Sequence, residues 1–220
     1  MAQNNTLASV IAAAKSQAEA PAPSVPAVAG SRPAPMTLQD FSQGSMSVDE
    51  FIKVKEHGLL IGTNHELISR LRVAIDMTEI QVCDAIKFGN PPTYYKTYDG
   101  ITCTAGGSWD QAKAKAVSID PNARPYKSAD IPCTLLEDAK DISGKKTVAE
   151  AGIRLGHSLS TTNKANFQEF LKEVGAQNLL SGVVEVALTA EAKSNKAGNR
   201  WGVLAFELIG EKAPDQAEAA

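Results

Sequence analysis

Long hydrophobic runs are missing from this chain of 220 residues. None of its apolar stretches approaches the roughly 18 to 20 residues that a membrane-spanning helix needs. The early stretch from Leu7 to Ala14 also lacks the preceding Lys or Arg of a secretory signal. We therefore expect a soluble, cytoplasmic protein with no membrane partner.

Cysteine is scarce as well. Cys83, Cys103 and Cys133 lie 20 and 30 residues apart, and this odd number without a close pair fits neither a disulfide framework nor zinc-ligand spacing. We expect all three to be reduced and buried, as free cysteines usually are.

Motifs of catalysis are absent too. The chain has no glycine-rich dinucleotide or phosphate loop, no Gly-x-Ser-x-Gly and no His-Glu-x-x-His. His57, His65 and His157 are not at metal-ligand spacing. Ser158 follows His157 directly, but neighbouring residues of a strand point to opposite faces, so this pair could not relay a proton. The sequence therefore predicts no catalytic residue, no metal site and no cofactor, and hence a protein that is not an enzyme.

An excess of basic residues is the last absence. Lys and Arg number 22 against 25 Asp and Glu, which gives a formal net charge of -3. Residues 37–210 alone hold 19 basic and 21 acidic side chains, so the two ends of the chain do not hide a basic domain. Any nucleic-acid site must be a local groove, because one face of a near-neutral protein can still carry a strong field.

What the chain does have is an Ala- and Pro-rich beginning. Residues 1–36 contain 11 Ala, 5 Pro and no aromatic side chain, which predicts a disordered arm. Residues 211–220 are again Ala-rich and predict a flexible C-terminal tail, with a single folded, β-rich domain over 37–210 between the two. Apolar residues at helical spacing over 6–15 leave two interpretations, a frayed terminus or a short helix that docks a protein partner.

Caps and periodicity predict the first elements of the domain. A capping box that begins at Ser47, with Gly58 as a stop, predicts a helix over 48–57. A strand begins at about 69, and its apolar phase changes between Met77 and Ile80. Such a change indicates a bulge, a bend or two separate strands.

Turn residues organise the middle of the chain. The Asp99-Gly100 pair predicts a hairpin within 93–104. The pattern over 109–118 is open between strand and helix, and 129–136 predicts a short strand. Residues 147–159 have the composition of a strand, or of a short helix that leads into one.

The C-terminal part of the domain has the clearest patterns. Phe167, Phe170 and Val174 form one apolar stripe, which predicts a surface helix over 163–174 packed on a core. Two alternating segments joined by a loop of turn formers then predict a terminal β-hairpin over 183–209.

Two clusters combine aromatic and basic side chains, the combination that binds single-stranded nucleic acid by stacking on bases and by contacts with phosphates. The first consists of Lys87, Tyr94, Tyr95, Lys96 and Tyr98. The second consists of Lys193, Lys196, Arg200 and Trp201. For each cluster a structural alternative stands beside the functional one: ordinary packing of tyrosines in a strand, and a second layer that covers Trp201.

The order of elements resembles the five-stranded OB fold of single-stranded DNA-binding proteins, with a long bent strand, further strands, a helix and a final hairpin. The resemblance covers roughly 67–210 and concerns architecture. It implies that the loops at 89–97 and 194–199 bind oligonucleotides. The region 105–160 is longer than a minimal barrel requires, and the C-terminus lacks the aromatic-ended acidic tip of the bacterial proteins.

These observations predict an α+β, mainly β fold that forms an OB-like, partly open barrel. The predicted function is sequence-tolerant binding of single-stranded DNA, accessory to replication or recombination as in phages and plasmids, with RNA an open second ligand and homo-oligomers expected. The alternative is a viral structural or assembly protein that oligomerises through its N-terminal arm.

Overall fold

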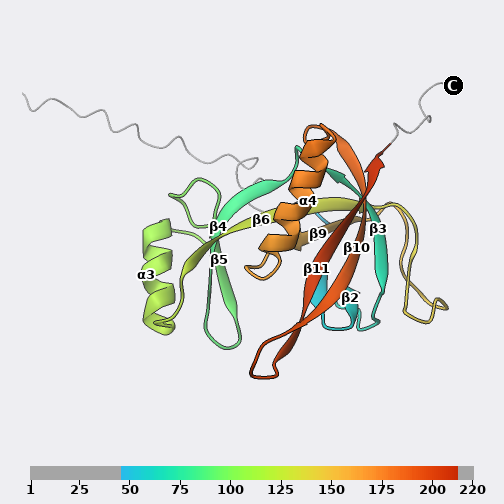
Figure 1. Ribbon diagram of the computed structural model, residues 1–220. Coiled ribbons are helices and arrows are strands. Elements are labelled where there is room, and N and C mark those ends of the chain that lie inside the picture. Colours follow the sequence, from blue (N-terminus) through green and yellow to red (C-terminus); the bar gives the residue numbers. More distant parts are fainter. Residues whose placement is uncertain (1–45, 213–220) are drawn as a thin grey trace, which may run out of the picture. The chain divides into compact units, whose positions relative to one another are not determined.

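The computed structural model describes residues 46–212 of the chain (Figure 1). The predictions for the arm over 1–36, for a docking helix over 6–15 and for most of the tail over 211–220 lie outside this part. The described residues form a mainly β structure with two helices.

The bounds of the elements are as follows. In chain order they are β1 Glu50–Lys55, β2 Gly58–Ile61, β3 Arg70–Asp76, β4 Gln81–Phe88, β5 Thr93–Thr97, α3 Trp109–Ile119, β6 Pro125–Leu135, β7 Ala139–Lys140, β8 Thr147–Ala149, β9 Arg154–Ser158, α4 Lys164–Ala176, β10 Val183–Ser194 and β11 Arg200–Glu211.

One mixed sheet organises most of these strands in the order β11-β10-β3-β6-β9-β1-β2, with β4 paired to β5 and β6. All its pairs are antiparallel except β1 with β9. The sheet is not closed, because β11 and β2 stay at its two ends. The β-rich class expected from the sequence is confirmed.

The phase change between Met77 and Ile80 marks two strands. Asp76 ends β3, and its carboxylate accepts a hydrogen bond from the backbone N–H of Thr78, which fixes a tight turn before β4. Both strands pair with the same side of β6, β3 near Leu135 and β4 along the first half of β6. The long β6 therefore joins two parts of the sheet.

The predicted helix over 48–57 is wrong, because this segment is strand β1. Ile52 is buried, and the two-residue turn after Lys55 leads directly into β2, where Lys55 pairs with Gly58. Gly58 is needed for close packing and does not end a helix: a Cβ there would lie 2.8 Å from the carbonyl oxygen of Ile68. Long-range pairing overrides the local capping signal.

The predicted hairpin over 93–104 is wrong as well. Strand β5 turns back on β4, and the reversal lies in the segment between Phe88 and Thr93. Asp99 caps a local loop, where its carboxylate accepts hydrogen bonds from the backbone N–H groups of Ile101 and Thr102. An Asp that satisfies nearby backbone donors in this way forms a turn without pairing two strands.

The main core lies between the sheet and α4, beside β11 (Figure 1). Phe167, Phe170 and Val174 are buried, as the apolar stripe predicted, and the Phe170 ring stacks on Phe206 at 5.2 Å between centroids. The helix over 163–174 and the terminal hairpin over 183–209 are thus confirmed to within two residues at each end.

A second, smaller core lies under α3, which resolves the open choice over 109–118 in favour of a helix. Ser108 caps this helix in a capping box with Gln111. Trp109 and two alanines of the helix pack against Ile86 and Phe88 of β4. Cys103 is buried in this second core, and Cys83 and Cys133 are also buried and free of disulfides, as predicted.

Strand β11 approaches β1 closely at Gly202. A Cβ at Gly202 would lie 2.0 Å from the carbonyl oxygen of Lys55 at the end of β1 and 3.0 Å from Val54. Two backbones can come this close only where one of them carries no side chain.

We expect Gly202→Ala to lower the free energy of unfolding by about 1 to 3 kcal/mol, because the methyl group forces β1 and β11 apart. Gly210→Ala in the same strand is the matched control, since a Cβ there meets nothing within 4 Å. Urea unfolding followed by circular dichroism measures both. Equal stability of the two variants would contradict the close approach.

Candidate nucleic-acid interface

Strand alternation divides the first aromatic cluster between two faces. Lys87 of β4 lies directly opposite Tyr94 of β5, while Tyr95 lies opposite Ile86 on the other face. The Tyr95 ring is 4.7 Å from that of Phe88 and packs against the second core. Packing, the structural alternative, therefore explains Tyr95. It does not explain Tyr94, which points to the other face.

Tyr94 is an exposed aromatic residue, with 49% of its surface accessible. The ammonium group of Lys87 lies 5.9 Å from the centre of the Tyr94 ring, within cation–π range. A positive charge and a flat ring thus stand next to each other at the surface, where a base and its phosphate could meet both.

Tyr126 adds a second ring to this face, and sequence reasoning missed it. It lies in β6 opposite Ala85, and Ala85 lies opposite Lys96 on β5, so Tyr126 shares a face with Lys96 and Tyr94. Burial, followed by the neighbouring Tyr94, raises the pKa of Tyr126 to about 12. The missing signal was the β4–β6 register, which no local pattern specifies.

The carboxylate of Asp130 holds the middle of the same face together. Only 2% of Asp130 is exposed. Its Oδ1 accepts hydrogen bonds from Lys96 Nζ at 2.6 Å and Ser158 Oγ at 2.7 Å, and its Oδ2 accepts one from the hydroxyl of Tyr98. Burial, and then the hydrogen bond to Asp130, raises the pKa of Tyr98. Lys96 and Tyr98 are thus engaged in tying β5 to β6 and β9.

Asp130→Ala should lower the free energy of unfolding by about 2 to 4 kcal/mol, because it leaves the half-buried Lys96 ammonium without its counter-ion. Asp84→Ala breaks the exposed pair with Lys127 and should cost less than about 1 kcal/mol. Chemical denaturation of both variants tests the difference. Similar losses in the two variants would show that the buried Asp130 network stabilises the fold no more than an exposed ion pair does.

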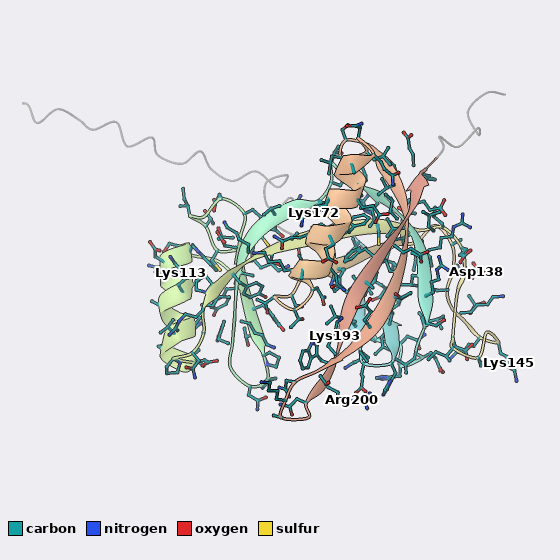
Figure 2. The ribbon with its side chains drawn as sticks, viewed as in Figure 1. Lys113, Asp138, Lys145, Lys172, Lys193 and Arg200 are labelled. Atoms are coloured by element: carbon teal, nitrogen blue, oxygen red, sulfur yellow. The ribbon has the colours of Figure 1, made fainter. Side chains whose placement is uncertain are left out.

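The second cluster lies at the outer end of the β10–β11 hairpin, where Figure 2 shows Lys193 and Arg200. Lys193 lies directly opposite Trp201. Lys193 Nζ is 3.1 Å from Glu191, and Arg200 Nε is 2.8 Å from Glu56 in the turn between β1 and β2.

Lys196, in the loop at the hairpin tip, is exposed. Among residues 46–212 no acidic group forms an ion pair with it. It is therefore the cation of this cluster that is available without displacing a carboxylate.

Trp201 is half-buried, and its neighbour on the same face, Val203, is buried at 3% exposure. A second layer therefore covers part of this face, as the structural alternative for Trp201 anticipated. The indole Nε1 is buried, and no hydrogen-bond partner for it occurs within the described part of the chain. Part of the Trp201 side chain stays accessible to solvent.

The two clusters belong to hairpins that extend toward the same edge of the molecule in Figure 1, the β4–β5 hairpin and the β10–β11 hairpin. Each carries exposed cations and one partly exposed ring, Tyr94 on the first and Trp201 on the second. The two loops lie far apart in the sequence, and both lie toward this edge in Figure 1.

His157 has a structural role. It is buried between the carbonyl oxygen of Ile52, 3.2 Å from Nδ1, and the side-chain amide of Asn163, 3.1 Å from Nε2, and burial lowers its pKa. Over residues 46–212, no three His, Cys, Asp or Glu side chains gather where they could hold a metal ion. Within the same range no helix is long and apolar enough to cross a membrane.

Comparisons with known proteins give no relative: no family model, no curated protein and no solved structure matches the chain. Its function must therefore be inferred from its own residues and their geometry.

The raised pKa of Tyr126 predicts a loss of stability in alkali. A folded-state pKa of about 12 against the ordinary value of 10.0 favours the neutral phenol in the folded state, so this contribution is full below pH 10.0 and is lost as the pH rises toward about 12. Tyr126→Phe cannot ionise, and its free energy of unfolding should fall less steeply over this range. Denaturant titrations at several pH values measure the slopes, and parallel slopes would refute the assignment.

Proposed function

We propose that this protein binds single-stranded nucleic acid without sequence preference. The observation that carries the proposal is the face of β4, β5 and β6, where the exposed ring of Tyr94 lies beside Lys87 and near Tyr126. Unpaired bases stack on such rings whatever their sequence, and a neighbouring ammonium group meets the phosphates.

The order of strand pairing supports an OB-like arrangement. The consecutive strands β3 and β4 both pair with β6, and β3 also pairs with β10. On its other edge β6 pairs with β9. Along the chain, α4 follows β9, and the hairpin of β10 and β11 comes last. An OB fold has the same succession, with the helix before its last two strands. Here β1 and β2 are additions, and the sheet is open where that fold forms a partly closed barrel.

The resemblance to OB folds also supports the two hairpins as the binding region, because oligonucleotides contact the first and last loops of that family. In this chain the first loop is extended by β5 and α3, and the last is the tip between Ser194 and Arg200. A strand of nucleic acid that crosses from one hairpin to the other would meet both clusters.

The proposed roles differ among the candidate residues. Tyr94, Tyr126 and Trp201 stack on bases, and Lys87 and Lys196 contact phosphates. Lys96 and Tyr98 position the face through Asp130, and Tyr95 supports it from the side of α3. Lys193 and Arg200 contact phosphates after they separate from their carboxylates.

The proposal is tested by fluorescence anisotropy with a labelled oligothymidine of about 20 nucleotides, longer than the roughly 4 to 16 that one OB fold covers. Tyr94→Ala should weaken binding roughly five- to hundredfold because a stacking platform is lost, while Tyr94→Phe keeps the ring and the affinity. Lys87→Ala should reduce the slope of log affinity against log salt by about 0.7.

Duplex DNA of the same length is the control for strandedness. No binding of the single strand at about 50 mM salt would refute the proposal, since phosphate contacts are strongest there. If, in addition, deletion of residues 1–35 dissolved a defined assembly seen by light scattering, the alternative of a structural or assembly protein would replace it. The biological process, replication or recombination, belongs to the same proposal.

A further inference from the structure

Two of the cations on the β10–β11 hairpin are held by carboxylates of the protein itself. Lys193 Nζ lies 3.1 Å from Glu191 on the same strand, and Arg200 Nε lies 2.8 Å from Glu56 on the β1–β2 turn. His57 also approaches Glu56, at 3.3 Å. With Lys196, the hairpin tip therefore combines three basic groups with two acidic partners.

In both ion pairs the basic side chain is exposed to solvent. The side chains of Lys193 and Glu191 are 49% and 48% exposed, and that of Arg200 is 60% exposed against 23% for Glu56. The Glu56 oxygen that faces Arg200 is close enough for an ion pair but is not aligned for a hydrogen bond. An exposed pair such as Lys193–Glu191 contributes little to stability, and the Arg200–Glu56 contact lacks a hydrogen bond, so another anion can replace either carboxylate.

The pair at the centre of the other hairpin is different. Asp130 is buried and accepts three hydrogen bonds, one of them from Lys96. Breaking that pair would leave a buried charge without a partner and would strongly destabilise the fold. Of the paired lysines and arginine in the two clusters, Lys193 and Arg200 of the β10–β11 hairpin are therefore the ones that can exchange their partners.

We propose that Glu56 and Glu191 act as internal stand-ins for phosphate, and that the backbone of a bound nucleic-acid strand displaces them from Arg200 and Lys193. This inference rests on the proposed function and adds how the same site is regulated. A carboxylate and a phosphate both offer oxygen acceptors to a guanidinium or ammonium group, so the two compete for the same donors.

The exchange favours a chain of phosphates over a single one. Lys196 has no carboxylate within the described residues and can capture a phosphate first. The next phosphates along the same strand then reach Arg200 and Lys193 at high effective concentration, whereas a lone phosphate gains nothing from the first contact. Trp201, opposite Lys193, offers its ring to a base between those phosphates.

The test compares Glu→Gln variants in the oligothymidine anisotropy assay. Glu191→Gln and Glu56→Gln together should tighten binding roughly three- to tenfold at low salt, because two weak competitors for the phosphate-binding groups are removed. The matched control is Glu66→Gln. Glu66 is paired with Lys146 at 2.9 Å and is 44% exposed, close to the 48% of Glu191.

The control separates exchange from net charge, because each substitution removes one negative charge. The loop that carries Lys145 and Lys146 lies well apart from the hairpin tip in Figure 2. Glu66→Gln should therefore leave the affinity almost unchanged. An equal gain in Glu66→Gln and Glu191→Gln would overturn the exchange and point to long-range charge alone.

A reversal variant makes the test specific for Arg200. Adding Arg200→Gln to Glu56→Gln should cancel the gain, since no guanidinium is left to be released. Thermal melting checks that the variants fold, and Glu191→Gln on the exposed strand face gives a readout even if Glu56→Gln destabilises the β1–β2 turn.

The outcomes distinguish the two proposals. Binding by the wild type with no gain in Glu191→Gln or in the double variant overturns the exchange and leaves the proposed function intact. Absence of binding in every variant, the double one included, overturns both. Thymidine monophosphate should bind the wild type far more weakly than oligothymidine by isothermal calorimetry, and equal affinity for this single phosphate would contradict the preference for a chain.

Discussion

The buried carboxylate of Asp130 is the interaction on which the candidate face depends. It lies on β6 and accepts hydrogen bonds from Lys96 on β5, from Ser158 on β9 and from Tyr98 just after β5. A carboxylate can be buried only if its charge is balanced and its lone pairs are used, and these three donors do both. The register of the strands around β6 is thereby fixed, and with it the side of the sheet on which Tyr94 and Tyr126 appear.

Much of the fold could be predicted because it follows from strong local periodicity. The stripe of Phe167, Phe170 and Val174 and the alternation along β10 and β11 specify their elements without knowledge of their partners. The helix expected over 48–57 failed because the box beginning at Ser47 is a short local signal, whereas the pairing of β1 with β2 and β9 involves residues far along the chain. Only part of the candidate site could be predicted, because strand pairing brings together residues that are far apart in the sequence. Clusters along the sequence revealed Tyr94 and Trp201, but Tyr126 joins them only through strand register.

Several basic side chains of the two clusters are neutralised by neighbouring carboxylates. Lys96, Lys193 and Arg200 each face an acidic partner, whose side chain is 2% exposed for Asp130, 23% for Glu56 and 48% for Glu191. The same type of contact thus serves two purposes according to its exposure: a buried pair fixes geometry, and an exposed pair is a reversible counter-ion. A net charge of -3 is therefore compatible with a surface that binds a polyanion.

Strand β6 links the main hydrophobic core to the strand that carries the second one. Its second half, from Ala129 to Leu135, packs in the main core, while its first half pairs with the part of β4 that carries Ile86 and Phe88 over α3. The α3 unit is thus joined to the rest chiefly by two strands, and such a unit can open at lower free energy than the whole domain. Any ligand that bridges the β4–β5 hairpin and the β10–β11 hairpin would couple the opening of α3 to global unfolding, so amide protons of α3 would exchange with solvent as slowly as those of the main core only in the bound protein.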